Sequence, residues 1–561
     1  MAGPRLLRIS DFLLLLVAWF TAALSACVIT AFFSSPAPSL YQVSFIPLLV
    51  TVLVAVPIYF GLQALRAMPF TRWLAANWPT LAVVLLVGRF AYRIVGISFS
   101  FPNLLALEKF SLPAEFLAVF IVSVLAGLGA AWLLVTQLPT RAARVVFFLG
   151  EHARGLLLAA LFFIVYFTLA NVFNRQDFNT NNVFFAADSH QWQLRLAGKS
   201  GTQMEMRAIH PLAFLILRPA VFAISLLFAA QPINALLFLL ALVGSAGLFL
   251  AWLFLYRATR NANFALLFTA LLGISTTNLV FNALAETYLF SAFLLILFFV
   301  LLQNGPRLRW LVLTGLAAFG VTISNLVQNM VGLIIVELKV RRALLFVLWI
   351  VGLGAALNLL SRQLFPDSAF FFDPSAYGVE SQHYQLGSTV QDWTARAGIV
   401  TRDMFLFSVI APQPFLLNYN RDVRGEFPKF NFMLGERSSA FIGLGKIAAW
   451  LWVGLLLGAL GAFAYSLRRE GLTATNRFGL AFLGCLAFNF VFHFFYGFEP
   501  FLYAADWTYA LVFFAALGLS AFADNKVLQA ALLVLLALLT LNNLSFVDFL
   551  LKGLSPYIPN V

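Results

Sequence analysis

The chain has 561 residues, of which 62% are hydrophobic and only 10% are charged. Soluble domains contain about 25% charged residues, so this composition excludes an ordinary soluble protein. The net charge of +13 fits cytoplasmic loops that set membrane orientation, and part of it could attract anionic lipid headgroups or a lipid phosphate. No basic run or basic–aromatic pattern indicates a nucleic acid partner. The two cysteines, Cys27 and Cys485, lie in apolar runs and predict no disulfide framework.

Apolar runs of about 18 to 25 residues recur along the whole chain, each long enough to cross a hydrocarbon layer about 30 Å thick. Because backbone polar groups in lipid must bond within their own segment, these runs predict helices. We therefore predict an all-α, polytopic integral membrane protein with about 13–17 transmembrane helices, the first of them retained rather than cleaved. The expected spans are 11–33, 44–65, 78–97, 114–137, 155–172, 233–256, 263–281, 287–303, two short spans within 310–337, 343–361, 441–465, 478–497, 503–522 and 527–546.

At the start of the chain, basic residues follow every second span, and they are Arg66, Arg72, Arg141, Arg144 and Arg154. The connection between the first two spans is mostly neutral. Positive loops face the cytoplasm, so the pattern predicts a cytoplasmic N-terminus, in the plasma membrane or the inner membrane of a bacterium. The fifth span then carries residues 174–210 to the outer face.

The run 212–230 is expected to lie in the outer interface instead of crossing. If it crossed, Arg257 and Arg260 after the next run would lie outside, against the charge rule. The pair Arg218-Pro219 also interrupts the run, and both residues are unfavourable within a span.

Similar reasoning predicts a hairpin of two short helices within 310–337, because basic residues flank this segment on both sides. A turn at Ser324-Asn325 would place Asn325, Gln328 and Asn329 on the outer side. The long polar segment 363–440 is expected to form a partly helical outer lid.

The first long polar interval, 181–212, contains an isolated acid, Asp188. A carboxylate on an outer loop can act as a general base or bind a metal. It can also cap a helix, because Asp is favoured immediately before one and 189–198 is predicted to be helical. The residues alone leave these alternatives open.

The pattern around Asp188 is an acid that opens a helix, then an aromatic residue, Leu196–Gly198, and a linker to His210-Pro211-Leu212 and an interfacial helix. It resembles the polyprenol-phosphate-dependent glycosyltransferases of the GT-C superfamily, above all the protein O-mannosyltransferases and lipid A aminoarabinose transferases. A second acid in those families opens a later outer loop, as Glu286 does. The chain departs from the pattern in that one proline only follows His210 and Asp188 has no acidic neighbour.

The resemblance covers about 151–362 and implies a GT-C-like catalytic membrane module there, with Asp188 as the catalytic base. Residues 1–150 would form a four-helix membrane region, 363–440 the outer loop region, and 441–561 the C-terminal membrane helices. The residues expected to bind the donor phosphate or substrate are His210, Arg207, Arg195, Lys199, Glu286, Asn325 and Gln328. For the basic residues, snorkelling at the interface is the alternative, and for His210 and Glu286 it is helix capping.

An aromatic turn with two acids could line a groove for the acceptor, or could belong to an aromatic belt at the interface. Its residues are Glu499, Tyr503 and Asp506. A divalent metal ion is possible. No glycine-rich phosphate loop is present in the sequence, so no nucleotide is expected.

These features together predict an enzyme of cell-envelope glycan biosynthesis. It would move a sugar from a polyprenyl phosphate to a glycan, lipid or protein acceptor at the outer face, among membrane lipids. Two alternatives remain, a surface-polysaccharide polymerase or ligase and a flippase or transporter of lipid-linked sugars. Inverted repeats would favour the flippase.

Overall fold

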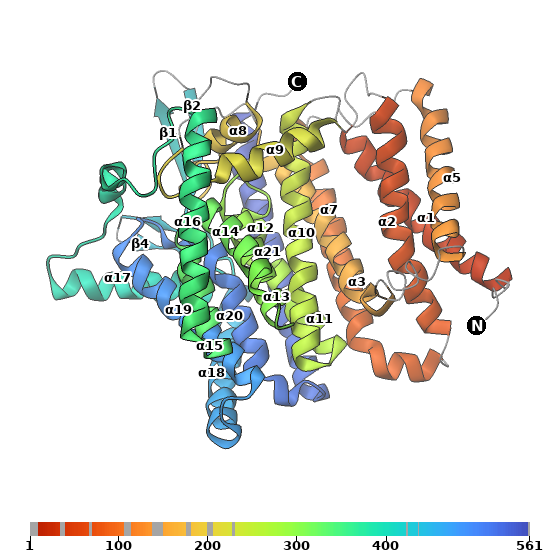
Figure 1. The fold of residues 1–561 in the computed structure, drawn as a ribbon. Coiled ribbons are helices and arrows are strands. Elements are labelled where there is room, and N and C mark those ends of the chain that lie inside the picture. The colour runs from red at the N-terminus through yellow and green to blue at the C-terminus, as the bar shows by residue number, and fades with distance from the viewer. Residues whose placement is uncertain are drawn as a thin grey trace.

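The computed structural model describes residues 9–33, 40–66, 70–105, 114–136, 148, 150–175, 181–198, 206–226, 231–421, 425–435 and 437–558. Most of these residues form helices that run along one common direction (Figure 1). In this part of the chain eight helices are long and apolar enough to cross a membrane, and further apolar helices have 10–17 residues. The fold is thus that of an all-α, polytopic membrane protein, as predicted. How many of the shorter helices cross stays a prediction.

The helices begin and end within a few residues of the apolar runs, because each run offers uninterrupted hydrophobic surface to lipid or to its neighbours. In the first half they are α1 Ile9–Phe33, α2 Leu40–Arg66, α3 Phe70–Phe99, α4 Pro102–Leu105, α5 Ala114–Thr136, α7 Ala153–Phe173, α8 Ser189–Ala197, α9 Ala213–Ser225, α10 Pro232–Thr259, α11 Ala262–Ile274 and α12 Thr276–Phe281. In the second half they are α13 Tyr288–Leu302, α14 Leu308–Val321, α15 Asn325–Glu337, α16 Val340–Leu364, α17 Val390–Arg402, α18 Leu444–Glu470, α19 Ala474–Phe495, α20 Ala505–Gly518 and α21 Lys526–Leu554. Short 3₁₀ helices are Pro374–His383, Pro500–Tyr503, Ser520–Phe522 and Ser555–Tyr557, and Asp403–Phe407 forms a π-helical turn.

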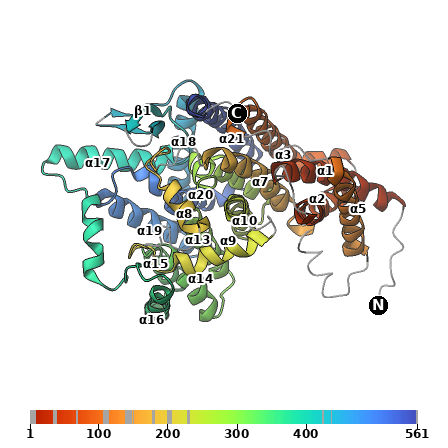
Figure 2. The ribbon, with the colours of Figure 1, turned by 90° about the horizontal axis from the view of Figure 1, so that it is seen from above.

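Helices α1, α2 and α5 stand together at one side of the molecule (Figures 1 and 2), where α2 packs against α7 of the main body. They share a small apolar core of their own around Leu15, Val56 and Tyr59. Helix α3 instead packs against α7, α11 and α21 and so belongs to the main body.

The predicted span 263–281 is not one helix. It is divided into α11 and α12 at Ser275, whose hydroxyl accepts a hydrogen bond from the amide of Asn278 at 3.4 Å. The amides of Thr276 and Thr277 leave the helical pattern and donate to the carbonyls of Val409 and Ser408, at 3.2 and 3.1 Å. The break thus depends on a segment more than a hundred residues later in the chain, which the apolar run itself does not reveal.

The predicted helical hairpin within 310–337 is confirmed as α14 and α15, joined at residues 322–324. Helix α9 has only 13 residues, contains Pro219 and lies near one end of the bundle (Figure 1), which is consistent with the expected interfacial helix. Its N-terminal segment is fixed to the hairpin turn. The amide of Leu212 donates to the carbonyl of Gly320 at 2.8 Å, and that of Ile323 to the carbonyl of Ile209 at 3.1 Å.

The segment 363–440 is partly helical, as predicted, but it also contains strands that were not predicted. Strands β1 (Phe415–Arg421) and β2 (Gly425–Asn431) form an antiparallel hairpin in which Phe415 lies opposite Asn431. A second, minimal pair consists of β3 (Met433–Leu434) and β4 (Arg437–Ser438). From above, α17 and the β1–β2 hairpin lie on the side away from α1, α2 and α5 (Figure 2).

The connections after α10, α13 and α15 meet at the end of the bundle opposite α8 and α9 (Figure 1). The Gln303 side chain donates to the Phe254 carbonyl at 3.0 Å, and Arg342 donates to the Pro306 carbonyl at 2.5 Å. Arg257 lies in the last turn of α10, and Arg309 and Arg341 lie in the first turns of α14 and α16, next to these connections.

The close approach of α14 to the segment before α9 requires a glycine. A Cβ atom on Gly320 would lie 2.6 Å from the Cβ of Leu212 and 2.9 Å from the Cδ1 of Ile216.

We predict that Gly320→Ala lowers stability by about 1–3 kcal/mol, because the contact must open. Thermal unfolding in detergent measures the effect. The control is Gly352→Ala in α16, where a Cβ meets nothing within 4 Å. It should be neutral or stabilising, since alanine favours helix. Equal changes in the two variants would contradict this.

Candidate functional site

Asp188 lies immediately before α8, at the end of a strained segment. Three residues in this segment, Asn182, Phe185 and Ala186, adopt positive φ angles of 65°, 50° and 62° although none is glycine. Such strain persists only where surrounding structure enforces it, and it is common at functional sites. Here strand β2 enforces it. The amide of Phe185 donates to the carbonyl of Phe430, and the amide of Phe430 donates to the carbonyl of Val183, both at 2.8 Å.

Asp188 occupies the N-cap position of α8, but its side chain makes no capping hydrogen bond. The side chain of Asn181 accepts the amide of Gln191 at 2.9 Å instead. Among the described residues, none donates a hydrogen bond to the Asp188 carboxylate. The alternative that this acid serves as the helix cap therefore loses its structural basis.

Glu286 lies beside Asp188, although 98 residues separate them in the chain. The amide of Asp188 donates to Glu286 Oε1 at 2.5 Å, and the amide of Thr287 donates to Oε2 at 3.3 Å. The loop that carries Glu286 is tied to the end of α7 by Asn174, which donates to the carbonyl of Ala283 at 2.6 Å and accepts from the amide of Ala285 at 2.9 Å. The two acids that the sequence placed on one side thus form a direct pair.

The two carboxyl groups of this pair differ in their environment. Burial raises the pKa of Asp188, while the charges of Arg207, Arg195 and His383 oppose that rise. Glu286 is only 2% exposed. Burial, and then the charge of Asp188, raise the pKa of Glu286 well above its ordinary value. Because the charge of Asp188 disfavours the ionised form of Glu286, Asp188 is the member of the pair that ionises first.

Arg207 is held by an acid that the sequence did not single out. Its Nε donates to Glu380 Oε1 at 2.8 Å and its Nη2 to Oε2, while the Tyr496 hydroxyl also donates to Oε2 at 2.7 Å. Burial alone would raise the pKa of Glu380, but the hydrogen bonds from Arg207 and Tyr496 keep it below the ordinary value. Much of the positive charge of Arg207 is therefore balanced inside the protein.

Arg195 lies on α8, with its guanidinium 5.2 Å from the centre of the Trp192 ring. The end of this helix is fixed by Arg218 of α9, which donates to the carbonyls of Arg195 at 2.7 Å and Gly198 at 2.8 Å. Arg218 thus acts as an anchor for the short helix that presents Arg195. Lys199 lies outside the described residues.

His210 is buried against Trp192, with ring centres 5.3 Å apart, and its Nδ1 lies 2.7 Å from the carbonyl of Val321. Because a carbonyl only accepts hydrogen bonds, Nδ1 carries the proton and Nε2 is left as an acceptor. Burial lowers the pKa of His210 to about 4, so the ring is neutral at physiological pH. As a neutral group it offers a phosphate no positive charge.

The three residues expected to line an acceptor groove face different surroundings. Tyr503 interacts electrostatically with Asp188, Glu286 and Arg207, and its ring lies 5.5 Å from that of Tyr288. Burial raises the pKa of Glu499 to about 7, the charge of Lys429 opposes that rise and the charge of Asp403 adds to it. Glu499 thus interacts with Lys429 and Asp403 rather than with the Asp188–Glu286 pair. Asp506 is buried in α20. Of the three, Tyr503 is the one with a described interaction with the Asp188–Glu286 pair.

Asn325 and Gln328 are fully buried between helices. Asn325 donates to the hydroxyl of Ser291 and the carbonyl of Ala318, each at 3.0 Å, and Gln328 accepts from the hydroxyl of Tyr509 at 3.0 Å. Their described contacts are with helices α13, α14 and α20 rather than with Asp188 itself.

A further residue, Arg396 of α17, organises the turn that presents Tyr496 and leads to Tyr503. Its guanidinium donates to five backbone carbonyls, those of His493, Phe494, Tyr496, Gly497 and Phe498, at 2.5 to 3.3 Å. These acceptors are the carbonyls left open at the end of α19. Backbone acceptors have no side-chain signature, so the sequence offered no signal for this role.

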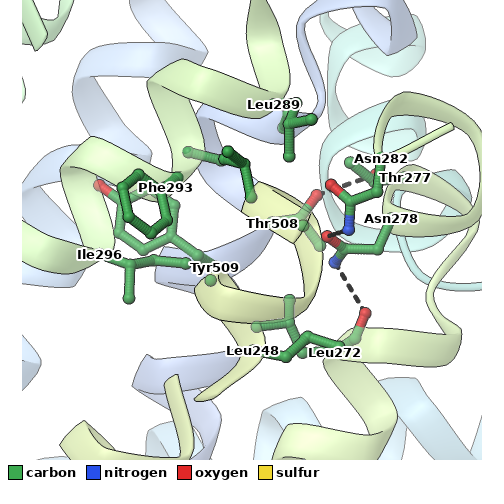
Figure 3. Close-up of a pocket in the computed structure, with 15 residues that line it drawn as sticks. Leu248, Leu272, Thr277, Asn278, Asn282, Leu289, Phe293, Ile296, Thr508 and Tyr509 are labelled. Carbon is green, nitrogen blue, oxygen red and sulfur yellow. Dashed lines mark hydrogen bonds between the residues drawn. The ribbon is translucent and has the colours of Figure 1, made fainter. Parts of the chain in front are cut away.

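A small cavity of about 20 Å³ lies between α10, α12, α13 and α20 (Figure 3). Asn278, Asn282 and Thr508 gather at one side of it, and Leu289, Phe293 and other apolar side chains form the rest. The polar groups bond to one another: Asn282 donates to Asn278 at 2.8 Å and Thr508 to Thr277 at 3.0 Å. The space suits about one water molecule and is too small for a sugar.

A divalent metal ion was considered possible. Among the residues that the structure describes, no three His, Cys, Asp or Glu side chains form a group that could hold one. Both oxygens of Glu286 accept backbone amides, so Asp188 is the carboxylate best placed to contact an ion. Mg²⁺ is commonly held by one or two carboxylates together with substrate phosphates.

No protein-family model matches the chain, and no curated protein or solved structure is significantly similar to it. A functional assignment therefore has to be argued from the arrangement of Asp188, Glu286 and the cations around them.

We predict that Arg396→Lys loosens the turn 493–498. A lysine ammonium cannot reach five carbonyls at once, and each buried acceptor left unpaired costs about 1–3 kcal/mol. Hydrogen exchange should become faster around this turn and thermal stability should fall. The control is Arg341→Lys, an exposed arginine at the opposite end of the bundle, which should leave both unchanged. Unaltered exchange at 493–498 in Arg396→Lys would contradict the anchoring role.

Proposed function

We propose that the protein is a membrane glycosyltransferase of the GT-C type. It takes a sugar from a polyprenyl-phosphate donor and passes it to an acceptor hydroxyl at the outer face of the membrane. The observation that supports this most is the Asp188 carboxylate. It opens a helix without capping it, it adjoins a second acid, and it lies within the electrostatic reach of Arg195 and Arg207.

Asp188 is the proposed general base. The proton of the acceptor hydroxyl passes to its carboxylate, and the oxygen uses the freed electron pair to bond to the anomeric carbon. The bond between that carbon and the phosphate oxygen breaks, and its electrons remain on the polyprenyl phosphate. One displacement of this kind inverts the configuration at the sugar.

The leaving phosphate requires positive charge, because negative charge develops on it as the bond breaks. Arg195 and Arg207 supply that charge in this proposal. Because Arg207 is paired with Glu380, only part of its charge is available to the phosphate. Neutral His210 supplies none, but its Nε2 can accept a hydrogen bond from a sugar hydroxyl.

Glu286 has a positioning role in this scheme. Its carboxyl group holds the amide of Asp188, and as the protonated member of the pair it leaves the negative charge on Asp188. A buried and neutral acid next to an ionised one is a common division between two carboxyls in active sites.

The distribution of charge along the bundle supports the outer location. The connections after α10, α13 and α15 lie at the end opposite α8 and α9 (Figure 1), and Arg257, Arg309 and Arg341 lie in the helix turns next to them. If those connections face the cytoplasm, as the positive-inside rule expects, the Asp188–Glu286 pair faces outward. A lipid carrier suits this arrangement, because its tail can remain in the membrane while its phosphate reaches the interface.

Asp188→Asn tests the base directly, because asparagine keeps the shape but cannot accept the proton. We predict that the variant folds and binds the lipid-linked sugar, while transfer falls by about 10²-fold or more. The control is Asp373→Asn. Asp373 is a true helix cap, with its carboxylate accepting the amide of Ser375 at 2.9 Å, and asparagine caps almost as well. Transfer by Asp188→Asn close to that of Asp373→Asn would exclude Asp188 as the base and direct attention to Glu286.

The pH dependence of transfer separates the two acids. A base must be ionised, so the rate rises with pH through the pKa of Asp188. Burial raises that pKa, and the rise should therefore lie above the range of an ordinary aspartate. Glu286→Gln replaces a protonated acid by a neutral amide and should keep most of the activity with nearly the same profile. Loss of transfer in Glu286→Gln, with Asp188→Asn still active, would reverse the two roles.

A further inference from the structure

Unpartnered polar atoms are concentrated where α13, α15, α19 and α20 meet. Each belongs to a side chain that is at most 3% exposed, and each has no hydrogen-bond partner among the described residues. The atoms are Thr287 Oγ1, Asn325 Oδ1, Gln328 Nε2, Asn329 Oδ1 and Nδ2, His493 Nδ1, Asp506 Oδ1 and Trp507 Nε1. Folded proteins leave few buried polar groups unpaired, because the loss of hydration is costly.

Several contacts show that these side chains share one region. The His493 ring lies 5.1 Å from that of Trp507, and the Tyr509 hydroxyl donates to Gln328 Oε1 at 3.0 Å. Asp506 precedes Tyr509 by three residues and so lies on the same side of α20. On α15, Asn325 and Asn329 are likewise on one face, four residues apart.

The same region adjoins the candidate site at the Asp188–Glu286 pair. Thr287 follows Glu286 directly in the chain. Tyr288 interacts electrostatically with Asp188, Glu286 and Asp506. His493 stacks on Tyr503 at 4.4 Å, and Tyr503 also interacts with the acidic pair. The polar groups thus extend from Glu286 into the bundle as far as Gln328 and Asn329.

The composition of the group indicates what can satisfy it. It offers acceptors on Asn325, Asn329 and Asp506 and donors on Gln328, Asn329, Trp507 and Thr287. A small ligand that both donates and accepts several hydrogen bonds is required. Water fulfils this, and buried waters characteristically bond to groups of this kind. By contrast, Asn282 and Thr508 at the cavity of Figure 3 bond to the side chains of Asn278 and Thr277.

We propose that the interface of α13, α15, α19 and α20 holds a row of ordered water molecules that connects Asp506 with the Asp188–Glu286 pair. The water site itself does not depend on the proposed glycosyl transfer.

Hydroxyl-radical footprinting by X-ray radiolysis of the purified full-length protein tests the water directly, because radicals formed from internal water label the side chains beside it. Trp507 and Trp452 are a matched pair, both fully buried. The indole N–H of Trp452 donates to the Phe405 carbonyl at 2.8 Å, whereas that of Trp507 has no described partner. We expect Trp507 to be labelled several-fold faster than Trp452. Equal, slow labelling of the two would overturn the proposal.

A substitution gives a second readout that does not involve transfer. Asn329→Leu replaces both unpartnered atoms by apolar ones of similar volume. If the interface is dry, the substitution removes the cost of two buried polar atoms without hydrogen bonds, and the Tm should rise. If the interface is hydrated, the substitution expels water, and both the Tm and the labelling of Trp507 should fall. The control is Asn543→Leu, because Asn543 is equally buried but fully bonded to Ile274, Val409 and Ala411. Its Tm should fall in either case while Trp507 labelling persists.

A rise in Tm for Asn329→Leu, or unchanged labelling of Trp507 in that variant, counts against the water row. If Asn329→Leu does not fold, the comparison of Trp507 with Trp452 in the unmodified protein decides alone. Transfer that persists in Asp188→Asn would contradict the proposed enzyme only and would leave the water row untouched, so the two proposals can fail separately.

Discussion

The hydrogen bond from the amide of Asp188 to the carboxyl group of Glu286 is the interaction on which the candidate site depends. It joins the start of α8 to the loop before α13, and Asn174 holds that loop to the end of α7. Because both acids are largely removed from water, neither can move without exposing a buried carboxyl or leaving an amide unpaired. The position of the two acids is therefore fixed by packing rather than by a flexible loop.

The polar side chains around this bond have two roles. Some carry the charge of the site, and others hold the charged residues in place. Glu380 balances Arg207, Arg218 fixes the helix that bears Arg195, and Arg396 closes the end of α19. Arginine suits the supporting role because its guanidinium presents five donors in a fixed plane. Three segments far apart in sequence are thus brought to one end of a bundle that is otherwise apolar.

The sequence revealed the elements that follow from hydrophobicity and charge alone. Apolar run length predicted the helices, and the basic residues at both ends of 310–337 predicted the hairpin of α14 and α15. Asp188 and Glu286 were placed on one side, but their direct contact was not foreseen. Charge rules give the side of the membrane on which a residue lies, not its neighbours there.

What the sequence did not reveal depends on partners distant in the chain. The break at Ser275 is completed by the carbonyls of Ser408 and Val409, and Arg207 meets Glu380 across 173 positions. Residues 415–431 were predicted only as part of the partly helical segment 363–440. Its strands became evident through pairing, since Phe415 to Arg421 lie opposite Gly425 to Asn431.

The bonds between Phe430 and both Val183 and Phe185 have a consequence for which changes in length this chain can accept. Side chains in a strand alternate between faces, so a shift of β2 by one residue would turn Phe430 away from Phe184, on whose ring it stacks at 5.7 Å. A single insertion or deletion between Gly425 and Phe430 would therefore alter the backbone that presents Asp188.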